Sequence, residues 1–161
     1  MRRFYALLCM MVLAISVYGF TVDGINYSED SYYGGVQVKG LEDKSYSGQL
    51  VIPETVTYNG VTYPIKGIYW QAFKDCTGIT SVHIGNNVLE IDQYAFAGCT
   101  ALSSVNLPES VTMIGINAFY GCNKLTSFTI PNSVSFVGAD AFTNTYLNGC
   151  KQPGITNTNH L

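Results

Sequence analysis

Three cysteines stand at equal intervals along the sequence. Cys76, Cys99 and Cys122 are each separated by 23 residues. Thiolates bind zinc or join as disulfides, but no Cys-x-x-Cys pair and no neighbouring histidine completes a ligand set here. The spacing therefore favours three buried thiols in equivalent positions of a repeated unit. A disulfide between neighbouring units in an oxidising compartment stays open as the alternative, and Cys150, outside the series, is left as a reactive thiol or a partner for another chain.

Serines recur at the same interval. Ser81, Ser104 and Ser127 occupy equivalent positions, and His83 and His160 are the only histidines. A serine nucleophile requires an adjacent base, and three equivalent serines do not share one. The acidic residues show no common pairing that would support acid–base catalysis. The sequence therefore predicts no catalytic residues, no metal site and no cofactor.

The composition excludes two further classes of partner. Of the 161 residues only 12% are charged, and the net charge is −3. Nucleic acids and anionic lipid surfaces attract basic patches, which this chain lacks. The 47% hydrophobic content is enough to bury the core of one domain.

The 23-residue interval governs the middle of the chain. An Ala-Phe pair places its aromatic ring at Phe73, Phe96, Phe119 and Phe142. Further apolar positions repeat in the same register: Ile79, Leu102 and Leu125; Val82, Val105 and Phe128; Ile84, Leu107 and Ile130; Ile68, Ile91, Ile114 and Val137. Repetition at this length indicates a solenoid, in which each unit, here called a coil, buries its apolar face against the next.

Each coil contains one segment with the alternation of a strand. In "LTSFTIPNSV" the apolar Leu125, Phe128 and Ile130 alternate with polar residues before a Pro-Asn turn. We expect one short parallel strand per coil, and a return arc that places the phenylalanine in the core. The side chains that then point outward form a candidate protein-binding face, the outer stripe: Ser81, His83, Ser104, Asn106, Ser127 and Thr129.

The first nineteen residues have the pattern of a signal peptide. Arg2 and Arg3 precede a short apolar run, and the small residue Gly19 precedes Phe20. The run is short for a membrane anchor and has no stop-transfer flank, so we predict export with cleavage before Phe20. The mature chain is expected to be secreted or at the cell surface, without membrane insertion.

The two ends of the array depart from the period. Val56 and Ile68 are 12 residues apart, whereas Val88 and Ile91 are 3 apart. The nine extra residues contain Asn59-Gly60, which predicts a hairpin turn. At the other end the coil positions after Phe142 lose their apolar residues, so the end of the chain is expected to be weakly ordered.

The repeated motif resembles that of a known family. "LSSVNLPESVTMIGINAFYGC" follows the pattern L-x-x-[VF]-x-[LI]-P-x-x-V-x-x-[IV]-G-x-x-A-F-x-x-C, which is similar to the BspA-like, Treponema-type leucine-rich repeats of bacterial surface proteins. The resemblance covers roughly Leu50 to Phe142. It implies a mainly β, right-handed array of about four 23-residue coils after an N-terminal β-hairpin cap.

The resemblance also bears on organisation and role. We expect a signal peptide (1–19), capping strands (20–49), a leucine-rich repeat domain (50–148) and a weakly ordered tail (149–161). It implies binding of a protein ligand or adhesion, with host or extracellular matrix proteins as candidate partners. A structural rod within a surface assembly is the alternative, and the sequence does not predict the oligomeric state.

Secretion supplies the first test. Because the charged, apolar and small-residue segments end at Gly19, the secreted chain should begin at Phe20. Amino-terminal sequencing of the exported protein measures this directly. A secreted chain that still begins at Met1 would contradict the prediction.

Overall fold

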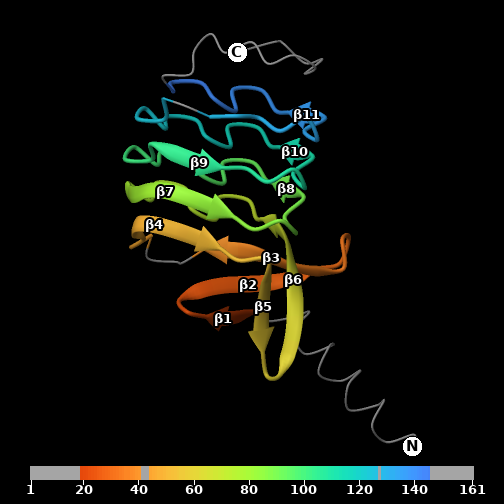
Figure 1. Ribbon diagram of the computed structural model, residues 1–161. Helices are drawn as coiled ribbons and strands as arrows, with labels where there is room; N and C mark the ends of the chain where they lie inside the picture. The colour runs from red at the N-terminus through yellow and green to blue at the C-terminus, as the bar shows by residue number, and fades with distance from the viewer. Residues whose placement is uncertain (1–18, 41–43, 127, 146–161) are drawn as a thin grey trace, which may run out of the picture.

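The computed structural model describes residues 19–40, 44–126 and 128–145, which form strands and turns without a helix (Figure 1). The predicted signal peptide up to residue 18 and the predicted tail lie outside these residues. The strands are β1 (Phe20–Val22), β2 (Ile25–Asp30), β3 (Gly35–Gly40), β4 (Ser47–Ile52), β5 (Thr55–Tyr58), β6 (Val61–Ile68), β7 (Gly78–Ile84), β8 (Glu90–Ile91), β9 (Ser104–Asn106), β10 (Met113–Ile114) and β11 (Phe136–Val137).

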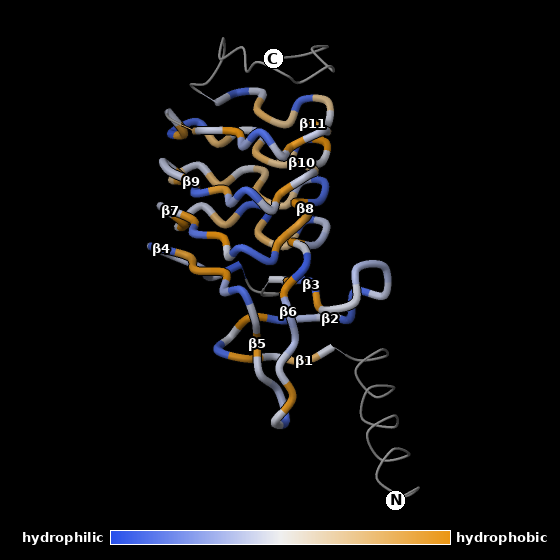
Figure 2. Tube along the Cα trace, turned by 45° about the vertical axis from the view of Figure 1, so that its right-hand side comes forward, coloured by the Kyte–Doolittle hydropathy of each residue, from blue (hydrophilic) through white to orange (hydrophobic). Residues whose placement is uncertain are grey.

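The strands make two sheets that climb the two sides of a layered stack (Figure 1). The small sheet has the order β4-β7-β9, and all its pairs are parallel. The large sheet has the order β1-β2-β3-β6-β8-β10-β11, and β5 also pairs with β6. Hydrophobic residues recur at matching places on successive layers (Figure 2). Both sheets therefore direct alternate side chains into one continuous core.

The strand register reproduces the 23-residue period. Val82 lies opposite Val105 in the small sheet. In the large sheet Ile114 lies opposite both Ile91 and Val137. Residues one period apart therefore occupy the same position on neighbouring layers, as the sequence predicted.

The expectation of one strand per coil was wrong in two respects. First, the return arc carries a second parallel ladder, β8-β10-β11, because two extended residues per layer suffice to pair with the layer before. Secondly, residues 128–130 form no strand, and residue 127 lies outside the described residues. Among the described residues the small sheet therefore ends at β9.

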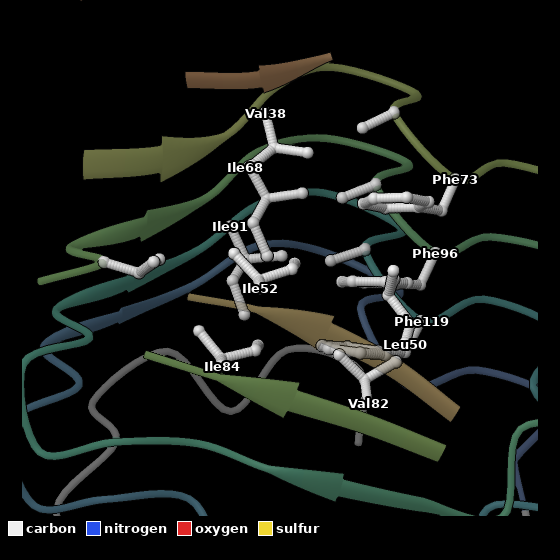
Figure 3. Close-up of a cluster of buried hydrophobic side chains, with 14 of the residues drawn as sticks. Val38, Leu50, Ile52, Ile68, Phe73, Val82, Ile84, Ile91, Phe96 and Phe119 are labelled. Atoms are coloured by element: carbon white, nitrogen blue, oxygen red, sulfur yellow. The ribbon is translucent and has the colours of Figure 1, made fainter. Parts of the chain in front are cut away.

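A column of phenylalanine rings fills the centre of the stack. Phe73, Phe96, Phe119 and Phe142 stack with ring centroids 5.3, 5.3 and 5.5 Å apart and ring planes within 9° of parallel. Figure 3 shows the first three rings above one another beside the side chains of Val38, Ile68 and Ile91. Tyr46 closes the N-terminal end of the column, edge-on to Phe73 at 5.1 Å. The ring spacing is close to the separation of paired strands. The same layer spacing therefore suits both the stacking of the rings and the hydrogen bonding of the backbone.

The return arcs are joined by backbone hydrogen bonds. The Phe73 N–H donates to the Ala95 carbonyl at 2.8 Å, and the Phe96 N–H donates to Ala118 at the same distance. Tyr94 has a positive φ of 57°, as have the equivalent residues Gln71, Asn117 and Asp140 at 57°, 56° and 56°. A left-handed backbone conformation at this position accompanies an arc in which every second N–H group points toward the next layer.

A glycine permits the close contact between arcs. A Cβ atom on Gly115 would lie 2.6 Å from the backbone nitrogen of Gln93 in the preceding layer, which is too close for any side chain. The absence of a side chain at this position therefore lets the two backbones approach closely.

The inserted hairpin is also present. β5 and β6 pair in antiparallel fashion with Tyr58 opposite Val61. The two residues between them, Asn59 and Gly60, have φ values of 51° and 77°, the left-handed pair of a tight hairpin turn. Phe20 stacks on Tyr58 at 4.5 Å, so the hairpin packs against the start of the described chain.

The described residues begin with three antiparallel strands. β1 pairs with β2 and β2 with β3, while β3 runs parallel to β6 and so continues the large sheet. The boundary drawn between residues 49 and 50 falls inside β4.

The phenylalanine column is tested by shortening one ring. Phe96 is fully buried between two other rings, so Phe96→Ala should lower the free energy of unfolding by about 3–5 kcal/mol. Urea unfolding followed by circular dichroism gives the value. Tyr120→Ala, at a ring that is 41% exposed, is the control and should change it far less. Equal losses for both variants would contradict the role of the column.

Candidate functional site

The small sheet brings together four of the six residues of the outer stripe. Ser81 lies opposite Ser104, and His83 lies opposite Asn106. Ser81 is half-buried, whereas the other three are exposed. Thr129 is exposed but belongs to no strand, and Ser127 lies outside the described residues.

The inward neighbours of these residues belong to the core. Val82 and Ile84 are 3% and 1% exposed, and Val105 is half-buried and packs against the same cluster. The alternation along β7 and β9 therefore separates a face available to a partner from one committed to packing.

The face is polar and uncharged. The Asn106 side-chain nitrogen lies 3.3 Å from Nδ1 of His83, so the amide donates when that ring nitrogen carries no proton. The Ser103 hydroxyl donates to the Thr80 carbonyl at 3.0 Å and ties β9 to β7. Such side chains can exchange hydrogen bonds with a partner, but they provide no nucleophile with an adjacent base.

The structure adds two residues that the stripe lacked. β4 pairs with the other edge of β7 and places Gln49 opposite Ser81 and Val51 opposite His83. Val51 is 50% exposed and is the one large apolar side chain on this face of the described strands. The offset of 32 residues from Val51 to His83 equals the period of 23 plus the nine-residue insertion. That sum was the signal in the sequence that could have identified them.

The three periodic cysteines lie in the core. Cys76, Cys99 and Cys122 have no exposed surface. The Cys99 thiol donates to the Phe73 carbonyl at 3.1 Å, and the Cys122 thiol donates to the Phe96 carbonyl at 3.2 Å. Among the described residues no disulfide joins any two of the three.

Burial keeps two of these thiols protonated. Desolvation raises the pKa of Cys99, and the neighbouring thiols of Cys122 and Cys76 add to the shift. Desolvation also raises the pKa of Cys122 to about 12, although a backbone hydrogen bond at Cys99 opposes it. Because metals and disulfide exchange require thiolates, these groups are suited to packing and not to chemistry.

Acidic residues gather near the turn between β2 and β3. Buried Asp30 accepts hydrogen bonds from the backbone N–H groups of Tyr32 and Tyr33, both at 3.0 Å, and from the Gln37 amide at 3.1 Å. Burial raises the pKa of nearby Glu90, with smaller contributions from Asp92 and Asp30. Asp30 therefore holds the turn. In the described parts of the chain no three histidine, cysteine or acidic side chains are placed to bind a metal ion.

Aromatic side chains mark the surface of the return arcs. Trp70 is 50% exposed and Tyr120 is 41% exposed. Lys39 lies over the ring of Tyr69, 4.3 Å from its centroid. The aromatic residues on this side therefore include rings open to solvent and a ring covered by a cation.

The repeated sequence matches a defined family model. The model of the BspA type leucine rich repeat region, described with six copies, matches residues 47–159. This chain belongs to the BspA-type leucine-rich repeat family. No curated protein sequence matches it significantly.

Solved leucine-rich repeat structures agree with this assignment. A leucine-rich repeat protein from Bacteroides ovatus has 35% sequence identity and a TM-score of 0.73 over 80% of this chain and 33% of its own. One from Bacteroides capillosus has 30% identity and a TM-score of 0.70 over 79% of this chain and 91% of its own. The leucine-rich repeat protein of Treponema pallidum, at 23% identity and a TM-score of 0.58, covers 78% of this chain and 67% of its own and shares the fold.

This chain spans about a third of the length of the Bacteroides ovatus relative. In its described residues no helix is long and apolar enough to cross a membrane.

The packing role of the cysteines is open to a labelling experiment. Because all three lie in the core, they should react with iodoacetamide only after denaturation. Intact mass counts the labels on the native and the unfolded chain. Thr100→Cys, which adds a thiol at an exposed position next to Cys99, is the control and should react at once in the native state. Rapid native labelling of all three, or a disulfide between two, would contradict this role.

Proposed function

We propose that this leucine-rich repeat chain is a secreted or cell-surface protein-binding module, and that its ligand contacts the outer face of the small sheet. Membership of the BspA-type family supports a role in interaction. One observation carries the choice of surface: the register aligns Val51, His83 and Asn106 across three adjacent strands while their neighbours are packed in the core.

The proposal includes the finer features predicted from the sequence. Residues 1–19 are removed on export, residues 20–49 cap the array, and residues 50–148 form about four right-handed coils. Host or extracellular matrix proteins are the proposed ligands, in an adhesive role. The tail from 149 to 161 is expected to be weakly ordered.

The size and chemistry of the face determine the expected affinity. Three strands about 4.8 Å apart present a surface only about 10 Å across the stacking direction. Tight interfaces usually rely on buried aromatic or arginine side chains, whereas this face offers one valine among polar groups. We therefore expect weak binding by a single chain and stronger binding where several copies are arrayed.

Two lysines in the middle of the face test the proposal. Ser104 and Asn106 are exposed on β9, so Ser104→Lys with Asn106→Lys should leave the circular dichroism spectrum unchanged. Binding to immobilised matrix proteins should fall on the order of tenfold, since a partner must desolvate two added charges. Surface plasmon resonance with the mature chain compares this double variant with wild type.

A matched variant carries the same charge elsewhere. Thr100→Lys with Asn123→Lys adds two lysines at exposed positions between the strands and the return arcs and should bind as wild type does. If the stripe variant folds and binds unchanged, the contact surface moves to the arcs around Trp70, or the chain is a spacer without its own ligand.

A further inference from the structure

The large sheet carries a row of outward-facing residues. The pairing of β6, β8, β10 and β11 places one residue per layer opposite the next, and we call these four the outer row: Gly67, Glu90, Met113 and Phe136. The residue that follows each of them is buried in the core. Their side chains therefore point away from the core, on the other side of the stack from β7 and β9 (Figure 1).

Large apolar side chains lie along this row. Phe136 is 41% exposed, and Met113 is half-buried on the layer before it. Ile116, three residues after Met113, is 38% exposed, and Trp70, at the equivalent position two periods earlier, is 50% exposed. Three of the six large hydrophobic side chains that are exposed in the described parts of the chain thus border one face. Such a gathering of exposed apolar side chains is typical of a protein-binding surface.

A carboxylate lies within the apolar surface. Glu90 stands between Gly67 and Met113 in the row. The Gln37 side chain covers Gly67, since a Cβ added there would lie 3.5 Å from its amide nitrogen, and the same amide donates to Asp30 at 3.1 Å. The β2–β3 end of the sheet thus encloses one side of Glu90, while the side toward Met113 and Phe136 borders exposed apolar groups.

The electrostatics around Glu90 favour a positive partner. Burial raises the pKa of its carboxyl, and the two charges that add to this shift, on Asp92 and Asp30, are negative. A cation brought to this carboxylate would be attracted by all three groups, whereas an anion would be repelled by them. The partner that complements the face is therefore basic at Glu90 and apolar beside it.

We propose that the outer row is a second protein-binding surface, whose partner places an arginine or lysine on Glu90 and apolar side chains on Met113 and Phe136. Arginine is the better fit, because its guanidinium can donate two parallel hydrogen bonds to a carboxylate while its stem packs on apolar groups. This surface goes beyond the one proposed on the small sheet and is independent of it, since it belongs to the other sheet.

Two synthetic peptides that differ in one charge are the probes. The first is acetyl-Arg-Ser-Leu-Ser-Leu-amide, in which the arginine and both leucines lie on one face of an extended chain. The second has citrulline, a neutral group of nearly the same shape, in place of arginine. Titration of the isotope-labelled mature protein with about 1 mM of the first peptide should shift the amide resonances of Glu90, Met113 and Phe136 most. The citrulline peptide should bind about fivefold more weakly.

Variants of the row separate its charge from its apolar part. Glu90→Gln keeps the shape of the side chain and should lower the affinity for the arginine peptide about fivefold while leaving that for the citrulline peptide unchanged. Phe136→Ala should weaken the binding of both peptides, because it removes an apolar contact that they share. Circular dichroism confirms that each variant is folded.

Glu109→Gln is the matched control. It removes the same charge at an exposed position after β9, away from the row, and should bind both peptides as wild type does. Equal losses for Glu90→Gln and Glu109→Gln would indicate general attraction to a negative chain and would overturn the proposal. Absence of binding by the arginine peptide would overturn it as well.

A last comparison keeps the two surfaces apart. The variant with Ser104→Lys and Asn106→Lys changes the small sheet and should bind the arginine peptide with resonance shifts at the same residues as wild type. Shifts centred on β7 and β9 would refute the assignment to the large sheet. Shifts of the row that grow with protein concentration in the absence of peptide would assign this face to a second copy of the chain instead. Neither result bears on whether matrix proteins bind the small sheet.

Discussion

Every layer of the molecule must repeat at the distance between paired strands. The phenylalanine rings stack at 5.3 to 5.5 Å, close to this distance. The arc hydrogen bonds from Phe73 to Ala95 and from Phe96 to Ala118, each 2.8 Å from nitrogen to oxygen, join the same layers. A larger or smaller residue in the column would separate the rings or leave a void, and the backbone ladders on both sides would have to follow. The distance between neighbouring layers therefore constrains both the core packing and the backbone pairing.

Polar groups obey the same spacing. The Ser110 hydroxyl donates to the Val88 carbonyl at 2.6 Å, and the Ser133 hydroxyl donates to the Val111 carbonyl at 2.7 Å. The thiols of Cys99 and Cys122 likewise donate to the layer before them, to the carbonyls of Phe73 and Phe96. Small donors at repeated positions thus satisfy carbonyl groups that a turn would otherwise leave without a partner. A solvent-facing stripe can vary without disturbing any of these bonds.

The sequence predicted the parts of the fold that repeat with strong patterns. The period, the inward residues such as Val82 and the Asn59-Gly60 turn could all be predicted, since alternation and turn residues are local signals. The ladder through Ile91 could not, because a strand of two residues is too short to show alternation. Val51 was missed although the insertion length was known, and the contacts of Asp30 arise only once the β2–β3 turn has folded.

The arc ladder has a direction, and this gives its two ends different chemistry. Each arc donates N–H groups toward the C-terminal side and accepts with carbonyl groups on the N-terminal side, as Ala95 accepts from Phe73. Ala72 is equivalent to Ala95 but has no earlier arc to donate to it. The Lys44 ammonium takes that place, 3.3 Å from the Ala72 carbonyl and 3.0 Å from that of Gln71. A coil added in the middle of the stack would keep every such bond, whereas replacing the first coil would also require a new cationic cap. Variation in length is therefore least costly within the array, where an added coil makes the same bonds as its neighbours.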